Sequence, residues 1–346
     1  MANSGNHHSG HNLIPDLSSL DWHPDELGPG FERADIHLGQ DPEGEGVAVA
    51  TLVRTLPAAK TGKPALLWVH GMTDYFFQTH VAEHFTQAGY PFYALDLRKC
   101  GRARQEGQRW HFSNDLAHYF PDLTAALRAI TQTHDSVVPI AHSTGGLIVP
   151  LWASYLRSTS PELHKRLGGI ILNSPWLDMM YPTWQVRIGT PLINVVGKHW
   201  PNVAVPGGNL GAYGESLHTS KHGEWDFDLV KKPIGGHTKY LGWLRTVILG
   251  QKQIQEGHAP VGCPVLTLCS SHSYLNQPYS AASNTADTVL DVEQIKRWAP
   301  QLSDEVQISV IDGARHDVFL SLTTARKAAF DATTDWLEAH FPTPAA

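Results

Sequence analysis

The stretch that decides the fold runs from an apolar strand through a serine into a helix: Val138-Pro139-Ile140-Ala141-His142-Ser143-Thr144-Gly145-Gly146. The apolar residues before His142 indicate a buried strand, and those after Gly146 recur at helical spacing (Leu147, Ile148, Leu151, Trp152). A turn this tight strains the serine backbone and lifts the Ser143 Oγ above the edge of the sheet. The sequence therefore predicts an exposed serine nucleophile at the tip of a strand-turn-helix.

Small residues flank the serine at two positions on either side, where the strand and helix backbones must approach closely. These positions hold Ala141 and Gly145, so the usual pattern G-x-S-x-G becomes A-x-S-x-G. Alanine adds one methyl group and is small enough for the turn. Because the same pattern also fits an ordinary turn between strand and helix, the catalytic interpretation depends on partners elsewhere in the chain.

Composition excludes several classes of protein. The chain has 346 residues, 42% of them hydrophobic, which supports a full core, and its net charge of -7 leaves no basic face for nucleic acid. The three cysteines (Cys100, Cys263, Cys269) suit buried positions in a reducing compartment better than a disulfide framework. No apolar stretch reaches the roughly 20 residues of a membrane-spanning helix. The polar N-terminus shows no signal peptide, so we expect a cytoplasmic protein.

Strand-like and helix-like segments alternate along most of the chain. Strands are expected over 31–38, 46–55, 65–69, 91–95, 169–172, 264–268 and 306–311, and helices over 78–88, 114–131 and 322–341. The first two strands are expected to form a hairpin, and Pro121 to kink its helix or mark the helix's true start. The alternation predicts an α/β fold with a doubly wound, mostly parallel sheet.

One long segment, residues 176–262, breaks this alternation and is expected to be an inserted cap over the carboxyl edge of the sheet. It holds five tryptophans (Trp176, Trp184, Trp200, Trp225, Trp243), most expected in a local core and one or two in an apolar pocket. Residues 21–175 and 263–346 would form the main domain, and residues 1–20 a flexible lead. The lead contains His7, His8 and His11, for which a disordered tail is favoured over a metal-binding tract.

A serine nucleophile needs a general base, and His316 has the expected position in the loop after the last strand. His340 falls inside the terminal helix, and His272 precedes the expected acid. The oxyanion would be bound by two backbone N–H groups, from Thr144 just after the serine and from Met72 in the loop His70-Gly71-Met72-Thr73-Asp74. We expect His70 itself to organise that loop.

The acid that orients the base is harder to assign, because the strand 264–268 runs into Cys269-Ser270-Ser271-His272-Ser273 without a carboxylate. Downstream, Asp291 begins a D-x-x-Q capping box and is expected to cap a helix, with Glu293 in its first turn. Asp287 has no visible structural role. We therefore predict Asp287 as the acid, with residues 274–286 as an extra excursion and Asp178 as the alternative.

The chain resembles the monoacylglycerol lipase and lysophospholipase branch of the serine α/β-hydrolases, from about residue 45 to the C-terminus. The matching pieces are Val69 to Asp74, Asp96 to Arg102, Ala141 to Gly146, Asp287 to Asp291, and Gly313 to Asp317. The resemblance implies the α/β-hydrolase fold with a cap. It also implies the triad Ser143, Asp287 and His316, the oxyanion pair Met72 and Thr144, and no cofactor or metal.

Within this resemblance one loop departs from the family pattern. Asp-x-Arg-Gly-x-Gly is usual, whereas Lys99-Cys100 stands here, and we take Asp96 as the structural anchor of that loop. The activity that the resemblance implies is hydrolysis of a carboxylic ester with an apolar acyl chain, such as a monoacylglycerol or lysophospholipid. The alternatives are a hydrolase of amides, lactones or carbon–carbon bonds, and a non-catalytic binding protein on the same scaffold.

Overall fold

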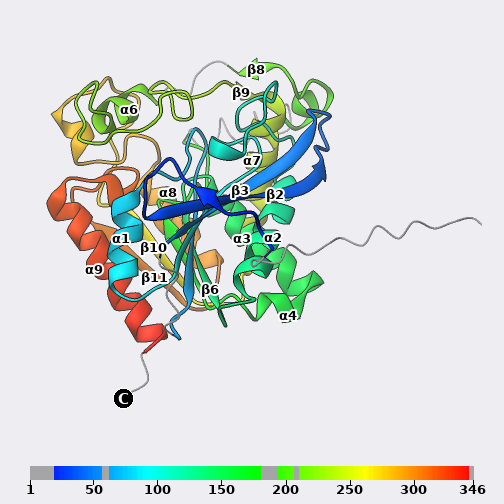
Figure 1. Ribbon diagram of the computed structural model, residues 1–346. Coiled ribbons are helices and arrows are strands. Elements are labelled where there is room, and N and C mark those ends of the chain that lie inside the picture. The colour runs from blue at the N-terminus through cyan, green and yellow to red at the C-terminus, as the bar shows by residue number, and fades with distance from the viewer. Residues whose placement is uncertain (1–18, 57–61, 181–192, 206–209, 343–346) are drawn as a thin grey trace, which may run out of the picture.

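A computed structural model describes residues 19–56, 62–180, 193–205 and 210–342. Its centre is a nine-stranded sheet of order β1-β2-β3-β5-β4-β6-β7-β10-β11 (Figure 1). The strands from β5 to β11 in this order are parallel, whereas β1, β2 and β3 join the edge antiparallel. The strands span His23–Pro24 (β1), Phe31–Gln40 (β2), Val47–Thr55 (β3), Ala65–Val69 (β4), Phe92–Asp96 (β5), Val137–His142 (β6), Ile170–Asn173 (β7), Val265–Ser270 (β10) and Val306–Ile311 (β11).

Helices cover both faces of this sheet, because its central strands are apolar on both sides. In β4, Leu66 and Trp68 belong to a core with α1 (Thr79–Gln87) and α9 (Thr323–His340). The alternate residues Ala65, Leu67 and Val69 belong to a core with α2 (Phe120–Ile130), α3 (Gly145–Thr159) and α8 (Val292–Trp298). Figure 1 shows α1 and α9 together on one side and α2 and α3 on the other. This is the predicted doubly wound, mostly parallel sheet.

The predicted elements agree with the observed ones except at a few ends. The segment expected as one helix over 114–131 begins as a 3-10 turn, and the α-helix starts only at Phe120, with Pro121 in its first turn. Proline fits that position because the first N–H groups of a helix have no intrahelical partner. Outside the segment between β7 and β10, the other short helices are α4 (Pro161–His164) and the 3-10 turns Gly101–Ala103, Leu116–Tyr119, Ala281–Asn284, Ala299–Gln301 and Val318–Leu320.

The segment between β7 and β10, residues 174–264, adds no strand to the main sheet within its described part. It contains β8 (Ala204–Val205), α6 (Gly211–Leu217), β9 (Lys239–Tyr240) and α7 (Leu241–Gln255). Figure 1 shows α6, β8 and β9 beyond one end of the sheet. By contrast, Trp243, Val247 and Ile254 of α7 pack into the same core as α3. The domain boundaries at 176 and 262 stay a prediction.

Part of the expected organisation lies outside the described residues. This holds for residues 1–18 of the lead, with His7, His8 and His11, and for Trp184. None of the helices in the described ranges is both long and apolar enough to cross a bilayer.

Candidate active site

Ser143 sits at a strained turn between β6 and α3. Its φ of +53° lies in the left-handed region, which non-glycine residues rarely occupy. The Ser143 N–H donates to the Asn173 carbonyl at 3.0 Å, which holds the turn against β7. A Cβ added at Gly145 would lie 2.5 Å from the His70 carbonyl oxygen, so this position needs glycine. The close approach places the loop after β4 directly against the serine.

A chain of hydrogen bonds connects the serine to an imidazole and a carboxylate. The Ser143 Oγ lies 2.9 Å from His316 Nε2, and His316 Nδ1 lies 2.9 Å from Asp287 Oδ2. The other carboxylate oxygen, Oδ1, accepts the N–H groups of Val289 and Leu290, each at 2.8 Å. These two bonds fix the carboxylate so that Oδ2 faces the imidazole. Asp287 is fully buried and His316 is nearly so, so water does not compete for their contact.

The other acids considered from sequence have different partners. Asp291 accepts the Glu293 N–H at 3.0 Å and caps α8, as predicted, but Gln294 does not complete the capping box, because its side-chain amide donates to the Met179 carbonyl at 2.8 Å. Asp178 accepts the Met179 N–H and, at 2.9 Å, the indole N–H of Trp298. Neither carboxylate is hydrogen-bonded to His316 within the described residues.

The rival histidines also lie away from the serine. His272 contacts Ser271, and His340 contacts Trp336 and Glu305 at the end of α9. His70 donates from Nδ1 to the Gly71 carbonyl at 2.8 Å and accepts the Leu97 N–H at Nε2, at 3.1 Å. Both ring nitrogens of His70 therefore hold loops in place, as expected.

Two backbone N–H groups border the serine. Those of Met72 and Thr144 donate no hydrogen bond to another group in the described ranges. Thr144 precedes the first residue of α3, so its N–H also lies at the positive end of the helix dipole. A Cβ added at Gly71 would lie 2.9 Å from the Ser143 Cβ and 3.4 Å from the Thr144 nitrogen, so the Met72 loop abuts the serine turn.

A second polar layer beneath the imidazole was not anticipated from sequence. Asp317 accepts from the Asn173 side-chain amide at 2.7 Å and from Gln78 at 3.1 Å, and the Asn173 Oδ1 accepts the Val318 N–H. These contacts tie the loop of His316 to β7 and to the start of α1. The only sequence signal was position, because Asn173 ends a strand and Asp317 follows the base.

His142 also lies beside the imidazole, with its ring centre 4.8 Å from that of His316. Its Nδ1 donates to the Asn173 carbonyl at 3.1 Å. The pKa of His142 is lowered to about 4, mainly by burial; Asp317 opposes this shift and the nearby His316 contributes to it. His142 is therefore neutral at pH 7.

An apolar pocket opens at the serine. Beside Ser143, Met72 and His316, its wall includes the following apolar residues: Trp176, Met179, Met180, Leu210, Trp243, Leu244 and Leu290. Two of the five tryptophans noted in the sequence, Trp176 and Trp243, thus line the pocket. Trp200 is 59% exposed and is not part of the wall, and Trp225 donates to the Leu320 carbonyl. Tyr213 of α6, unremarked in the sequence, places its ring 5.4 Å from that of His316.

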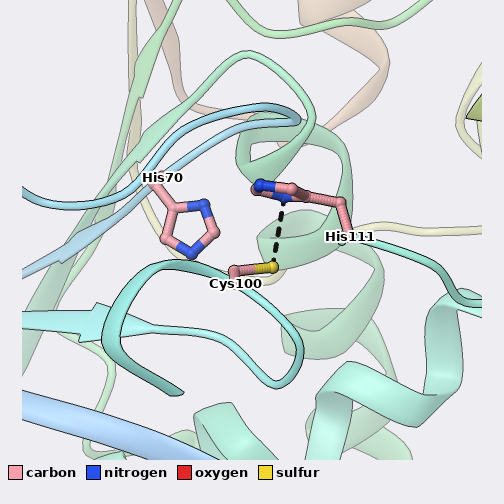
Figure 2. A group of neighbouring side chains, drawn as sticks. All are labelled: His70, Cys100 and His111. Atoms are coloured by element: carbon pink, nitrogen blue, oxygen red, sulfur yellow. Dashed lines mark hydrogen bonds between the residues drawn. The ribbon is translucent and has the colours of Figure 1, made fainter. Parts of the chain in front are cut away.

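In the described ranges, three buried side chains have ligand atoms close enough for a metal ion, within 4.8 Å of one another: His70, Cys100 and His111 (Figure 2). The Cys100 Sγ lies 3.2 Å from both the Arg98 carbonyl oxygen and His111 Nδ1. Because both nitrogens of His70 are already engaged, His70 offers no lone pair to an ion. Burial also raises the pKa of the Cys100 thiol, which disfavours the thiolate that binds metals. This donor set suits hydrogen bonding better than metal binding.

The fold and the serine turn define the class: the protein is a serine hydrolase of the α/β-hydrolase type. More specifically, the chain belongs to the family described as serine aminopeptidase, S33, whose model matches residues 61–322. Membership of this enzyme family argues against the alternative of a non-catalytic binding protein on the same scaffold.

Relatives and solved structures agree with this class. A monoacylglycerol lipase of Mycolicibacterium smegmatis is 26% identical over 265 residues, covering 75% of this chain and 82% of that protein. A soluble variant of monoglyceride lipase from Saccharomyces cerevisiae superposes with a TM-score of 0.61 at 17% identity, covering 94% of this chain and 95% of that one. A monoacylglycerol lipase of Paleococcus ferrophilus superposes with a TM-score of 0.57 at 18% identity, covering 82% of this chain and 98% of that one. The two structures share the fold.

Proposed function

We propose that this serine hydrolase cleaves carboxylic esters with an apolar acyl chain, of the monoacylglycerol or lysophospholipid type, through an acyl-enzyme intermediate. The observation that carries the proposal is the continuous path of hydrogen bonds from Ser143 through His316 to Asp287, at the floor of an apolar pocket. In this proposal Ser143 is the nucleophile, His316 the general base and Asp287 the residue that orients the base.

Acylation begins when the ester carbonyl lies over the Ser143 Oγ. His316 Nε2, at 2.9 Å, removes the hydroxyl proton as Oγ attacks the carbonyl carbon. The imidazolium that forms is stabilised by the Asp287 carboxylate on its other nitrogen. The carbonyl oxygen becomes an oxyanion, and the backbone N–H groups of Met72 and Thr144 are the donors proposed for it. When the intermediate collapses, His316 returns the proton to the departing alcohol.

Deacylation repeats these steps with water. His316 accepts a proton from a water molecule, whose oxygen attacks the acyl carbon, and the proton then returns to the Ser143 Oγ as the free acid forms. Each turnover consumes one ester and one water and restores the enzyme. No step requires a metal or organic cofactor.

The acyl chain is proposed from the chemistry of the wall. Indole, thioether and leucine side chains attract a hydrocarbon chain by burying it away from water. The names of the relatives supply the head-group expectation, since three of them are described as monoacylglycerol or monoglyceride lipases. The predicted cap, residues 176–262, supplies much of the wall in its described part and is proposed to select the substrate.

A cytoplasmic location is part of the proposal, and the three free cysteine thiols support it.

A substrate panel tests the proposal. We expect turnover of monoacylglycerols and lysophosphatidylcholine of medium or long chain, labelling by an alkyl phosphonate, and loss of both in Ser143→Ala. The loss in turnover should be on the order of a thousandfold or more, with an unchanged melting temperature. His272→Ala is a matched control for His316→Ala, because His272 has no contact with the serine. Faster cleavage of aminoacyl anilides than of any ester would replace the proposed substrate class.

A further inference from the structure

The loop that carries Met72 is bonded to the segment 174–264 at three consecutive residues. The Thr73 Oγ1 accepts the His237 N–H at 3.0 Å, and Asp74 Oδ1 accepts from the Lys232 ammonium at 2.6 Å. The Tyr75 hydroxyl then accepts the Asp228 N–H at 2.8 Å. All three partners lie within residues 228–237, so one short stretch of the segment holds the loop directly after a proposed oxyanion donor.

The loop needs this support because its backbone is strained. Thr73, next to Met72, has a φ of +56°. A non-glycine residue in this region costs on the order of 1–3 kcal/mol and persists only where its surroundings enforce it. The bond from His237 to the Thr73 side chain and the ion pair at Asp74 are such constraints. Without them the loop is free to relax, and the Met72 N–H would turn with it.

The ion pair between Lys232 and Asp74 is buried. The side chains are 7% and 2% exposed. Around the Lys232 ammonium, the rings of Phe77, Tyr213 and Phe227 lie at 5.5, 5.5 and 5.7 Å. The second Asp74 oxygen, Oδ2, has no hydrogen-bond partner in the described part of the chain. Within the described residues, Lys232 is therefore the one cation paired with Asp74, and little of either side chain is open to water.

Both members of this pair line the pocket together with Ser143 and Met72. Negative charge develops at the Met72 N–H during the reaction, two residues from Asp74. In a dry site an uncompensated carboxylate at that place opposes the developing oxyanion, because electrostatic interactions are strong where water is excluded. The position of Lys232 removes that opposition.

We propose that Lys232 is a positioning residue for the oxyanion hole: its ammonium neutralises Asp74 and ties the Met72 loop to the segment 174–264. The role rests on the proposed function at Ser143. It differs from substrate binding, because Lys232 acts through Asp74 and the loop.

The test compares Lys232→Met with the double variant D74N/K232M, which removes both charges, and uses Lys231→Met as the matched control. Lys231 belongs to the same stretch of chain but pairs with the exposed carboxylates of Glu26 and Asp228, lies 5.2 Å from the centre of the Tyr75 ring, and has no ion pair with Asp74. A medium-chain p-nitrophenyl ester reports kcat and KM. An alkyl trifluoromethyl ketone reports the oxyanion hole, because its adduct with the serine carries the oxyanion.

In Lys232→Met we expect kcat to fall about 10- to 100-fold and ketone affinity to fall in parallel, with KM within about threefold; loss of one oxyanion donor sets the upper scale. The double variant should regain most of both losses and lie within about fivefold of the parent, and Lys231→Met should match the parent. Equal losses of kcat and ketone affinity in the single and double variants would mean that neutralising Asp74 plays no part in catalysis, and would overturn the proposal. A rise in KM at unchanged kcat would make Lys232 a substrate contact instead.

Two further outcomes are distinguishable. If Lys232→Met does not fold, the test uses Lys232→Arg and D74N/K232M instead. The proposal requires both variants to bind the ketone within about fivefold of the parent's affinity. A tenfold loss of ketone affinity in both variants overturns it. If the parent neither hydrolyses esters nor binds the ketone, the proposed function fails, whatever the variants do.

Discussion

Ser273 and Asp287 form an isolated parallel β-bridge, which closes the base of the loop between them. The Tyr274 N–H donates to the Asp287 carbonyl at 2.7 Å, and the Asp287 N–H donates to the His272 carbonyl at 3.0 Å. Residues 274–286 thus leave the end of β10 and return to it. Asp287 is thereby held beside residues 272–274, just after the end of β10, although it is 17 residues beyond Ser270 in sequence.

We predict different roles for the three carboxylates Asp287, Asp291 and Asp178. We expect Asp287→Asn to lower turnover by up to about four orders of magnitude with little change in stability, because the amide cannot stabilise the imidazolium. Asp291→Ala should lower the free energy of unfolding by roughly 0.5–2 kcal/mol through loss of a helix cap, with near-normal turnover. Kinetics and thermal melts on both, and on Asp178→Asn, check this assignment. A folded, inactive Asp178→Asn beside a fully active Asp287→Asn would contradict it.

Acyl-chain preference should depend on the two tryptophans of the pocket wall. Trp176→Ala or Trp243→Ala removes apolar wall from the pocket, so we expect the preferred chain length to shift in rates measured across a series of esters. Trp200→Ala is the control, because Trp200 is 59% exposed and outside the wall. If both wall variants keep the parent's profile while retaining activity, the acyl chain binds elsewhere.

Gly145 is expected to tolerate no side chain. Alanine there would place its Cβ 2.5 Å from the His70 carbonyl oxygen and 2.8 Å from that of Val69, and backbone atoms cannot move aside as side chains do. Gly145→Ala should therefore lose folded protein or, where folded, most of its turnover. Gly30→Ala is the matched control, since nothing lies within 4 Å of a Cβ at that position. Normal expression and kinetics of Gly145→Ala would show that the turn has more room.

Lys99 should be a strong determinant of stability. It replaces the usual glycine of its loop at a φ of +61°, and its buried ammonium lies 2.9, 2.5 and 3.2 Å from carboxylate oxygens of Asp41, Glu43 and Glu45. Lys99→Met removes the buried cation that these carboxylates share, and of the lysine and arginine side chains paired with them only Arg109 remains, at Glu45. The free energy of unfolding in urea should therefore fall by about 3–5 kcal/mol. Lys165→Met, which breaks an exposed pair with Glu162, should change stability by less than about 1 kcal/mol. Similar losses in both variants would contradict the role of burial.

The lowered pKa of His142 predicts that the protein becomes less stable in mild acid. Its folded pKa of about 4 lies below its unfolded pKa of about 6.5, so between these values the unfolded chain binds the proton and the folded chain does not. Stability is therefore lost as pH falls from about 6.5 toward 4. Between pH 7.5 and pH 5, the free energy of unfolding measured in urea should fall by about 2 kcal/mol more in the parent than in His142→Gln. Parallel losses in both would show that His142 does not titrate in this range.

The elements of the sheet were predictable because their causes are local. The continuous apolar run of β4 indicated a strand buried on both faces, and Pro121 marked the start of a helix. The serine turn was equally readable, since the small residue needed at Gly145 follows from backbone contact within one strand-turn-helix. The cap of α8 at Asp291 also involves only adjacent residues.

Only the tertiary structure decided which residues far apart in the chain are in contact. Closure of the loop at Ser273 brings Asp287 to His316, and the segment 174–264 brings Lys232 to Asp74 and Tyr213 to the imidazole. No local pattern marks these positions, because a lone lysine or tyrosine carries no periodicity. Their importance comes from burial, which removes water and makes each charge depend on one distant partner.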